Sequence, residues 1–135
     1  MSLAEFINSE EDSVTPVLSD GLLIIDYNLI CISTTFATCK PNEINEDTLK
    51  HLIFNTIRAN VKKFKGTYPD IVLAVDNGLG GYWRRDIASY YKGNRKKDRD
   101  KSPWDFDVIF RVMNTVKDGV KDNFPYRILD IPRCE

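Results

Sequence analysis

Two short apolar runs, each ending on an aspartate, constrain this sequence more than any other feature. They occupy residues 21–26 and 71–76, and their β-branched content predicts two fully buried strands. Between them, apolar residues recur every three or four positions over residues 45–66, which predicts a long amphipathic helix. A strand, a helix and a strand at this spacing predict parallel pairing through a right-handed crossover. The sequence therefore predicts an α/β fold.

A second helical pattern and a third apolar run extend this unit. The helical pattern covers residues 104–121 and the run covers residues 126–131, so we expect a partial parallel sheet of three strands with flanking helices. A chain of 135 residues is the size of one domain, and we place it at residues 21–135. Residues 1–20 contain five acidic residues and no Lys or Arg, and we expect them to form an acidic N-terminal extension.

Both strand-end aspartates should lie at one edge of the sheet. Asp26 and Asp76 end neighbouring parallel strands, and ligands of open α/β sheets bind at that carboxyl edge. Glu135, just past the third strand, would be a third acid there. Crowded carboxylates favour a hard cation such as Mg²⁺ or Mn²⁺, which serves phosphoryl transfer. The plainer alternative is that each aspartate caps a helix or a turn.

The basic residues gather in one stretch, although the formal net charge of the whole chain is −1. Residues 82–101 hold eight Lys or Arg residues against three acids, and aromatic residues are interleaved with them. Basic side chains neutralise phosphates and flat rings stack on exposed bases, so this mixture suits a single-stranded or frayed nucleic acid. The alternative is a solvated basic loop whose aromatic side chains lie in the core.

Several other classes of protein find no support in the sequence. No phosphate loop, dinucleotide-binding fingerprint or serine-hydrolase elbow occurs, and the single histidine, His51, falls in a helical pattern as a surface or packing residue. Cys31, Cys39 and Cys134 are widely spaced, so we expect reduced, buried thiols and no zinc site. No apolar run is long enough to cross a membrane, and the acidic start is unlike a targeting peptide, which indicates a cytosolic protein.

Four motifs in a fixed order resemble a known family. They are L-I-I-D-Y at residues 23–27, I-V-L-A-V-D-N at 71–77, G-Y-W-R-R-D at 81–86 and Y-Y-K-G-N-R at 90–95. Together they resemble the N-terminal half of the ribonucleases H of T-even-type bacteriophages, members of the flap endonuclease (5′-nuclease) family. The resemblance implies the N-terminal part of the 5′-nuclease (PIN-like) fold, with a basic helical arch over about residues 82–104.

The resemblance implies a Mg²⁺-dependent phosphodiesterase. Such a 5′–3′ exonuclease and flap endonuclease would remove RNA primers during phage DNA replication, in the cytoplasm of the infected bacterium. Its substrates would be DNA and RNA·DNA duplexes with a 5′ end or flap, and a replication single-stranded-DNA-binding protein would be a partner. The implied metal ligands are Asp26, Asp76 and Glu135. The implied catalytic residues are Lys92, Arg95 and Arg84, and the implied nucleic-acid-binding residues are Arg85, Tyr91, Lys96, Lys97, Arg99 and Lys101.

Further acids and a DNA-binding region that the family carries after the position of Glu135 do not occur in this sequence. We therefore expect a split nuclease that needs a separate C-terminal half and is inactive or weak alone. The alternatives are a non-catalytic module that binds single-stranded or flapped nucleic acid, and the relic of a split nuclease gene. A receiver-type phosphoacceptor domain is a more distant rival, because Asp26 lacks the adjacent second acid which that fold requires.

Overall fold

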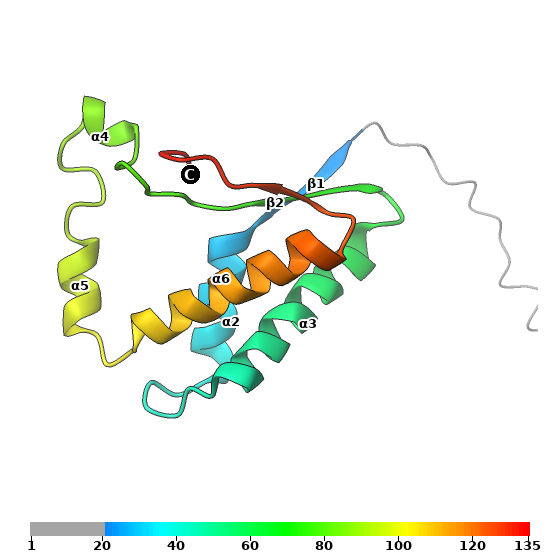
Figure 1. Ribbon diagram of the computed structural model, residues 1–135, viewed down its shortest axis with the longest axis horizontal. Helices are drawn as coiled ribbons and strands as arrows, with labels where there is room; N and C mark the ends of the chain where they lie inside the picture. Colours follow the sequence, from blue (N-terminus) through cyan, green and yellow to red (C-terminus); the bar gives the residue numbers. More distant parts are fainter. Residues whose placement is uncertain (1–20) are drawn as a thin grey trace, which may run out of the picture.

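The computed structural model describes residues 21–135, so the acidic extension predicted for residues 1–20 lies outside the described part of the chain. Three strands and five helices follow one another in this part (Figure 1). Their bounds are β1 Leu22–Asp26, α2 Tyr27–Thr38, α3 Glu46–Phe64, β2 Asp70–Ala74, α4 Arg84–Ile87, α5 Arg95–Lys101, α6 Phe106–Asn123 and β3 Arg127–Leu129. Over residues 21–135 no helix has the length and apolar character to cross a bilayer.

The three strands form one parallel sheet in the order β1-β2-β3, which confirms the predicted α/β fold. Along β1 and β2, Leu22 pairs with Asp70 and Asp26 pairs with Ala74. β3 is shorter than predicted and pairs only with residues 72–74. Since all three strands are parallel, their carboxyl ends lie at the same edge of the sheet.

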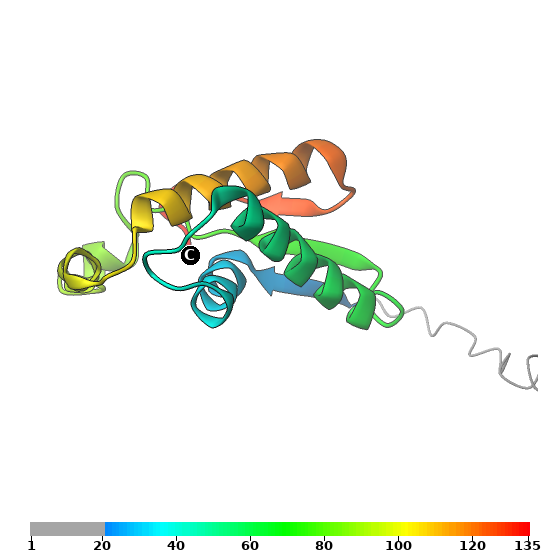
Figure 2. The ribbon, with the colours of Figure 1, turned by 90° about the horizontal axis from the view of Figure 1, so that it is seen from below.

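Within residues 21–135, helices cover one face of the sheet. α2, α3 and α6 pack against one another, and α3 and α6 lie along the strands in both ribbon views (Figures 1 and 2). Their apolar side chains form one core with Ile25, Ile71 and Leu73 of the strands. On the other face, Ile24 is 64% exposed and Leu129 is 51% exposed. The prediction that residues 21–26 form a fully buried strand is therefore wrong for one of its faces.

The two long helices begin and end where the sequence predicts. Asn45 caps α3 by accepting a hydrogen bond from the Thr48 amide at 3.0 Å, and acids in the first turn and lysines in the last complement the helix dipole. Asp105 caps α6 in the same way through the Val108 amide. His51 lies exposed on α3, as predicted.

Helix α2 was not predicted, and it begins directly at the end of β1. The Asp26 carboxylate caps it by accepting a hydrogen bond from the Leu29 amide at 2.9 Å. The buried Tyr27 hydroxyl donates to the Met113 carbonyl at 2.5 Å and so joins α2 to α6.

Residues 82–104, which we call the arm, project from the carboxyl edge of the sheet and carry α4 and α5 (Figure 1). The basic helical arch that the resemblance implies for this stretch contains the helix α5, over Arg95–Lys101. The alternative that the aromatic residues of this stretch lie in the core holds for Trp104, which packs against the core, but not for Trp83 and Tyr90, which are 43% and 84% exposed.

Candidate functional site

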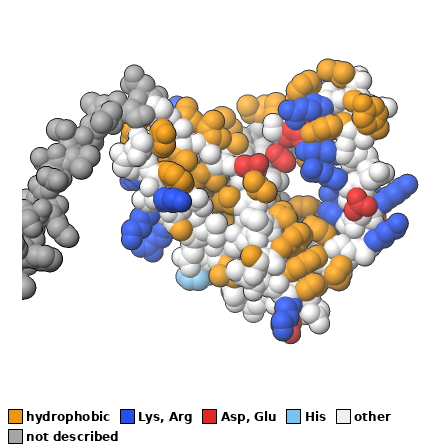
Figure 3. All heavy atoms as spheres, turned by 180° about the vertical axis from the view of Figure 1, so that it is seen from behind, with side chains coloured by type: hydrophobic (Ala, Val, Ile, Leu, Met, Phe, Trp, Pro, Cys, Tyr) orange, Lys and Arg blue, Asp and Glu red, His pale blue; other side chains and the backbone are white. Residues whose placement is uncertain are grey.

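A cleft of about 950 Å³ separates the arm from the body of the protein. The carboxyl ends of β1 and β2 lie at one end of it, and residues of α2, α5 and the start of α6 line it further along. Figure 3 shows acidic side chains close to Lys and Arg side chains around a hollow that apolar side chains border. Its charged lining residues are Asp26, Asp76, Glu135, Arg84, Lys92, Arg95, Asp98 and Arg99. The structure thus brings together in one cleft all six of the predicted catalytic and metal-binding residues and two of the predicted nucleic-acid-binding residues, Tyr91 and Arg99.

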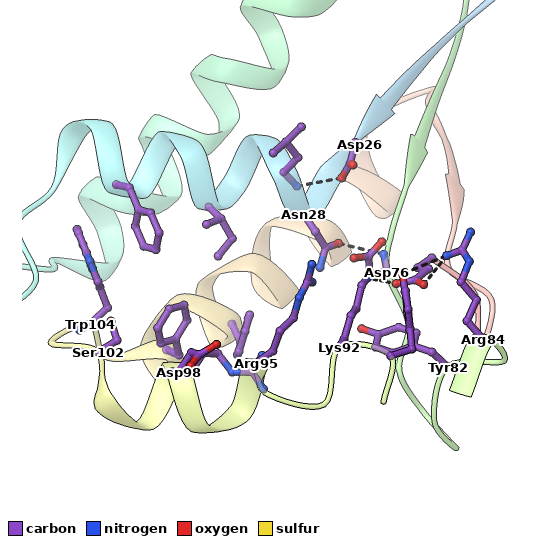
Figure 4. Close-up of a pocket in the computed structure, with 18 of the residues that line it drawn as sticks. Asp26, Asn28, Asp76, Tyr82, Arg84, Lys92, Arg95, Asp98, Ser102 and Trp104 are labelled. Carbon is purple, nitrogen blue, oxygen red and sulfur yellow. Dashed lines mark hydrogen bonds and ion pairs between the residues drawn. The ribbon is translucent and has the colours of Figure 1, made fainter. Parts of the chain in front are cut away.

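The two strand-end aspartates lie at this edge for a topological reason. Asp26 is the last residue of β1, and Asp76 follows β2 by two residues, on the neighbouring parallel strand. The Asp76 amide donates a hydrogen bond to Asn28 Oδ1 at 3.0 Å, which ties the end of β2 to the first turn of α2 (Figure 4). The prediction that both carboxylates share one edge is therefore confirmed, and Asp26 is in addition the helix cap that the alternative interpretation foresaw.

These carboxylates fit part of a site for a hard divalent cation. Mg²⁺ in phosphate-processing sites is commonly held by one or two carboxylates together with water and substrate phosphates. Within residues 21–135, however, no group of three or more His, Cys, Asp or Glu side chains is arranged to hold a metal ion. Asp26, whose Oδ1 also caps α2, and Asp76 are the carboxylate pair at this edge, because Glu135 is paired with Arg84 and Lys92.

Glu135 lies between two basic side chains of the arm. Its carboxylate is 4% exposed and accepts hydrogen bonds from Arg84 and Lys92 (Figure 4). Buried charges of this kind are stable when they are paired, so Glu135 holds both cations at the mouth of the cleft. Its role as a metal ligand stays a prediction.

Lys92 occupies an unusual position for a lysine. Its side chain is 15% exposed, and its backbone has a φ of 52°, in the left-handed region that non-glycine residues seldom adopt. Burial lowers the pKa of the Lys92 ammonium, the nearby Arg95 guanidinium acts in the same direction, and the Asp76 carboxylate opposes both. A strained, buried cation beside two carboxylates is the kind of group found at functional sites.

The remaining basic residues of the arm divide into two groups. Arg95 and Arg99 of α5 line the cleft, and Arg99 lies over the Phe110 ring. Arg85 donates from Nε to the Tyr91 carbonyl at 3.2 Å and packs over Tyr82. The predicted nucleic-acid-binding residues Lys96, Lys97 and Lys101 are exposed on α5 and do not line the cleft.

Aromatic and aliphatic side chains form the far wall of the cleft. Phe36 of α2 stacks on Trp104, with ring centroids 4.7 Å apart, and contacts Phe106 edge to face. Leu29 and Phe36 are among the exposed large apolar residues of the protein. Sequence analysis missed this wall because its residues come from two helices far apart in the chain, and no spacing in the sequence links them.

Asn28 is the other site residue that sequence analysis missed. Its side-chain oxygen accepts the Asp76 amide proton and so fixes the distance between the two strand ends. The signal that could have found it is its position two residues after Asp26, in the first turn of a helix that was not predicted.

Comparison with known proteins finds relatives among nucleases. The chain is 43% identical over 118 residues to the ribonuclease H of Enterobacteria phage T4, a match that covers 86% of this chain. It is 28% identical over 105 residues to a 5′-3′ exonuclease of Mycoplasmopsis pulmonis, a match that covers 78% of it. The matches cover 39% and 33% of these relatives, so the chain spans less than half the length of either. No family model matches the sequence.

Proposed function

Because this chain is related in sequence to the T4 ribonuclease H-like 5′-nucleases over most of its length, we propose that it forms the substrate-gripping part of a Mg²⁺-dependent 5′-nuclease. The reaction is hydrolysis of phosphodiester bonds at the 5′ end or flap of DNA and RNA·DNA duplexes, as in primer removal during phage DNA replication. One observation carries the proposal: the strand-end carboxylates Asp26 and Asp76 line the same cleft as the basic pair Arg84 and Lys92 (Figure 4).

The charges of the cleft suit a polyanionic strand. Lys92 and Arg84 would grip the phosphate next to the scissile bond, exchanging their contacts with Glu135 for contacts with phosphate oxygens. Arg95 and Arg99 on α5 would neutralise the phosphates that follow, while the aromatic wall around Phe36 and Trp104 would contact unstacked bases. Tyr91, whose hydroxyl accepts a hydrogen bond from Arg84 at 3.5 Å, would stack near the 5′ end.

Asp26 and Asp76 would hold the divalent cation together with the substrate phosphate. When bound, such a cation neutralises phosphate charge and supplies activated water for hydrolysis. The chain's own residues do the rest: Asn28 keeps the two strand ends in register, and Lys92 and Arg84 orient the phosphate toward the carboxylates.

The relatives are more than twice as long as the matched region, so we propose that elements beyond the match complete the site. These would supply further acids and DNA-binding elements, in a C-terminal half docked against this chain. On this proposal, the chain alone binds flapped nucleic acid and cleaves it weakly or not at all.

The metal-site assignment is tested by Asp76→Asn in the complemented enzyme, by which we mean this chain mixed with a separately supplied C-terminal half of a related nuclease. We expect cleavage of a labelled 5′-flapped duplex to be lost while DNA binding stays close to wild type, because the amide keeps the shape but not the charge needed for the cation. Asp70→Asn, at the opposite end of β2, is the matched control and should cleave normally. Normal cleavage by Asp76→Asn would remove Asp76 from the site.

A second candidate function is binding of single-stranded or flapped nucleic acid without catalysis. It is favoured by the pairing of Glu135 with Arg84 and Lys92, which engages the third predicted metal ligand in ion pairs. Such a module would bind with an affinity that falls steeply with salt and does not depend on Mg²⁺. The complemented cleavage assay separates the two functions.

A further inference from the structure

The last residues of the chain run alongside the loop that leads into the arm. The Asn77 amide donates to the Cys134 carbonyl at 2.8 Å, and the Trp83 amide donates to the Arg133 carbonyl at 3.1 Å. Further back, the Asn77 side chain donates to Asp130 at 2.9 Å, and Asp130 also accepts from Lys117 of α6. Residues 130–135 are therefore hydrogen-bonded to residues 77–83 at several points.

Arg133 contributes both its backbone and its side chain to these contacts. Its backbone φ is 69°, a left-handed conformation that costs free energy for any residue with a Cβ and persists only where neighbouring contacts impose it. Its Nε donates to the Gly81 carbonyl at 3.1 Å, and its Nη2 pairs with the Asp86 carboxylate. One side chain thus holds both the loop before α4 and α4 itself.

Asp86 and Arg84 lie on the same short helix, α4, two residues apart. Successive helical residues are rotated by about 100°, so these two side chains point in nearly opposite directions. Arg133 holds α4 through Asp86, and Arg84 on the other side reaches Glu135, Tyr91 and the cleft. The orientation of α4 therefore decides whether Arg84 faces the cleft.

We propose that Arg133 and Asp86 form a clasp that positions Arg84 for phosphate binding. The inference rests on the proposed function, in which Arg84 grips a phosphate. Neither clasp residue touches the substrate: both act through the orientation of α4 and of the chain around Trp83. With the clasp intact, Arg84 is ordered before the substrate arrives, so binding does not have to order it.

The decisive variant is Asp86→Arg. Its affinity for a labelled 5′-flapped duplex is compared with that of the wild-type full chain, without divalent metal and at several salt concentrations. This change adds positive charge near a polyanion, so a purely electrostatic role predicts tighter binding. A positioning role predicts binding that is weaker by about threefold to tenfold, the effect of having to order one long side chain. The slope of log K against log salt should also become shallower by about 0.9, the value of one phosphate contact.

The double variant Asp86→Arg with Arg133→Glu re-forms the pair with its charges exchanged. It should restore both the affinity and the salt slope if the ion pair positions α4, although it lacks the hydrogen bond from Arg133 Nε to the Gly81 carbonyl. Arg133→Lys, which keeps the ion pair with Asp86 and also gives up the bond to Gly81, should bind nearly as the wild type does. The control is the charge-exchanged double variant Glu46→Arg with Arg111→Glu. These residues form an exposed ion pair between α3 and α6 outside the cleft, so exchanging their charges should leave the salt slope unchanged.

The outcomes separate this inference from the proposed function. A wild-type chain that does not bind the flapped duplex contradicts the proposed function. Wild-type binding combined with equal or tighter binding by Asp86→Arg, or with no recovery in the double variant, overturns the clasp. Circular dichroism of each variant identifies loss of folding, and in that event Arg133→Lys must still bind as wild type for the inference to stand.

Discussion

Lys92 combines three properties that seldom occur together in a lysine. It has a left-handed backbone, a side chain that is mostly withdrawn from water, and a pKa that burial lowers. Glu135 neutralises it in the structure described here, and a substrate phosphate would take the place of that carboxylate. Such a cation stabilises the transition state more than the bound substrate, because negative charge develops on the phosphate during the reaction.

In the complemented enzyme, Lys92→Ala should therefore slow the chemical step more than it weakens binding. We expect the single-turnover cleavage rate to fall by about a hundredfold, the typical loss when one charge-stabilising donor is removed. Lys97→Ala, on the exposed side of α5, should weaken binding at most and leave that rate unchanged. An unchanged rate for Lys92→Ala would remove Lys92 from catalysis.

The three thiols differ in their surroundings, although the sequence led us to expect all of them to be buried. Cys31 is buried, Cys39 is half-buried and Cys134 is exposed, and all three are free. Burial raises the pKa of the Cys31 thiol to about 12, with the Tyr27 hydroxyl lowering it and the Asp26 carboxylate raising it to smaller extents. Because the thiolate is the reactive form, Cys31 should be inert in the folded protein.

A thiol-specific chromogenic reagent at pH 8 tests this expectation. Cys134 should react rapidly in the native protein, and Cys31 should react only after denaturation. Cys134→Ser should remove the fast phase completely. A fast phase that disappears instead in Cys31→Ser would contradict the burial of Cys31.

Single residues of the site were predictable only where topology fixes them. Asp26 and Asp76 could be placed together because both end parallel strands, and that argument needs no knowledge of side-chain packing. The aromatic wall and the clasp residue Arg133 could not be found in this way. Their partners lie tens of residues away, and only the folded chain shows that Phe36 meets Trp104 or that Arg133 meets Asp86.

At the scale of elements, an ion pair joins α6 to the end of β3. Lys117 donates to the Asp130 carboxylate at 2.6 Å, and Asn77 donates to its other oxygen. The hydrogen bond from Lys117 is the main reason why the pKa of Asp130 is lowered. Burial acts in the opposite direction, and the hydrogen bond from Asn77 lowers the pKa further. A carboxyl group with a lowered pKa stabilises the fold above its ordinary titration range, and that stability is lost as the pH falls through its folded-state pKa.

Asp130→Asn should therefore destabilise the protein near pH 7, and this destabilisation should shrink progressively as the pH falls below about 4, the ordinary titration range of the carboxyl group. The expected difference at neutral pH is about 1 kcal/mol, because the pair is partly exposed. Thermal unfolding of both proteins at several pH values measures this, with Asp118→Asn on the exposed side of α6 as the control. A difference that stays constant down to pH 3 would contradict the assignment.

Elements with strong periodicity were predictable and the others were not. α3 and α6 repeat apolar residues at helical spacing and carry capping residues, so both were predicted to within about two residues. α2 is rich in Thr and Ile, residues that favour strands when no partner decides otherwise. Its helix forms because Asp26 caps it and because Tyr27 and Cys31 find a place in the core.

At the scale of the whole molecule, the outer face of the sheet is apolar and exposed in the described part of the chain. Ile24 and Leu129 lie on this face, on the two outer strands. The protein alone should therefore bind a hydrophobic dye such as ANS while folded. Replacing both residues by Thr should reduce dye binding severalfold without lowering the helix content measured by circular dichroism. Unchanged dye binding would mean that this face is covered in solution.

The separation of charge between body and arm was predictable at this scale, whereas the depth of the cleft was not. Eight basic residues in twenty positions already indicated a basic segment, and the family resemblance implied a helical arch there. The cleft forms because α5 lies apart from the body of the protein. No local sequence pattern encodes the distance between two elements that a loop joins.

The most direct test of the account is cleavage of an end-labelled 5′-flapped duplex in Mg²⁺. The chain is assayed alone, together with the part of phage T4 ribonuclease H that lies outside the matched region, and with that part and Asp76→Asn in place of the wild type. We predict cleavage only in the wild-type mixture, which would place Asp26 and Asp76 in a working metal site. Binding of the duplex without cleavage in any mixture would contradict the nuclease assignment and leave a nucleic-acid-binding module.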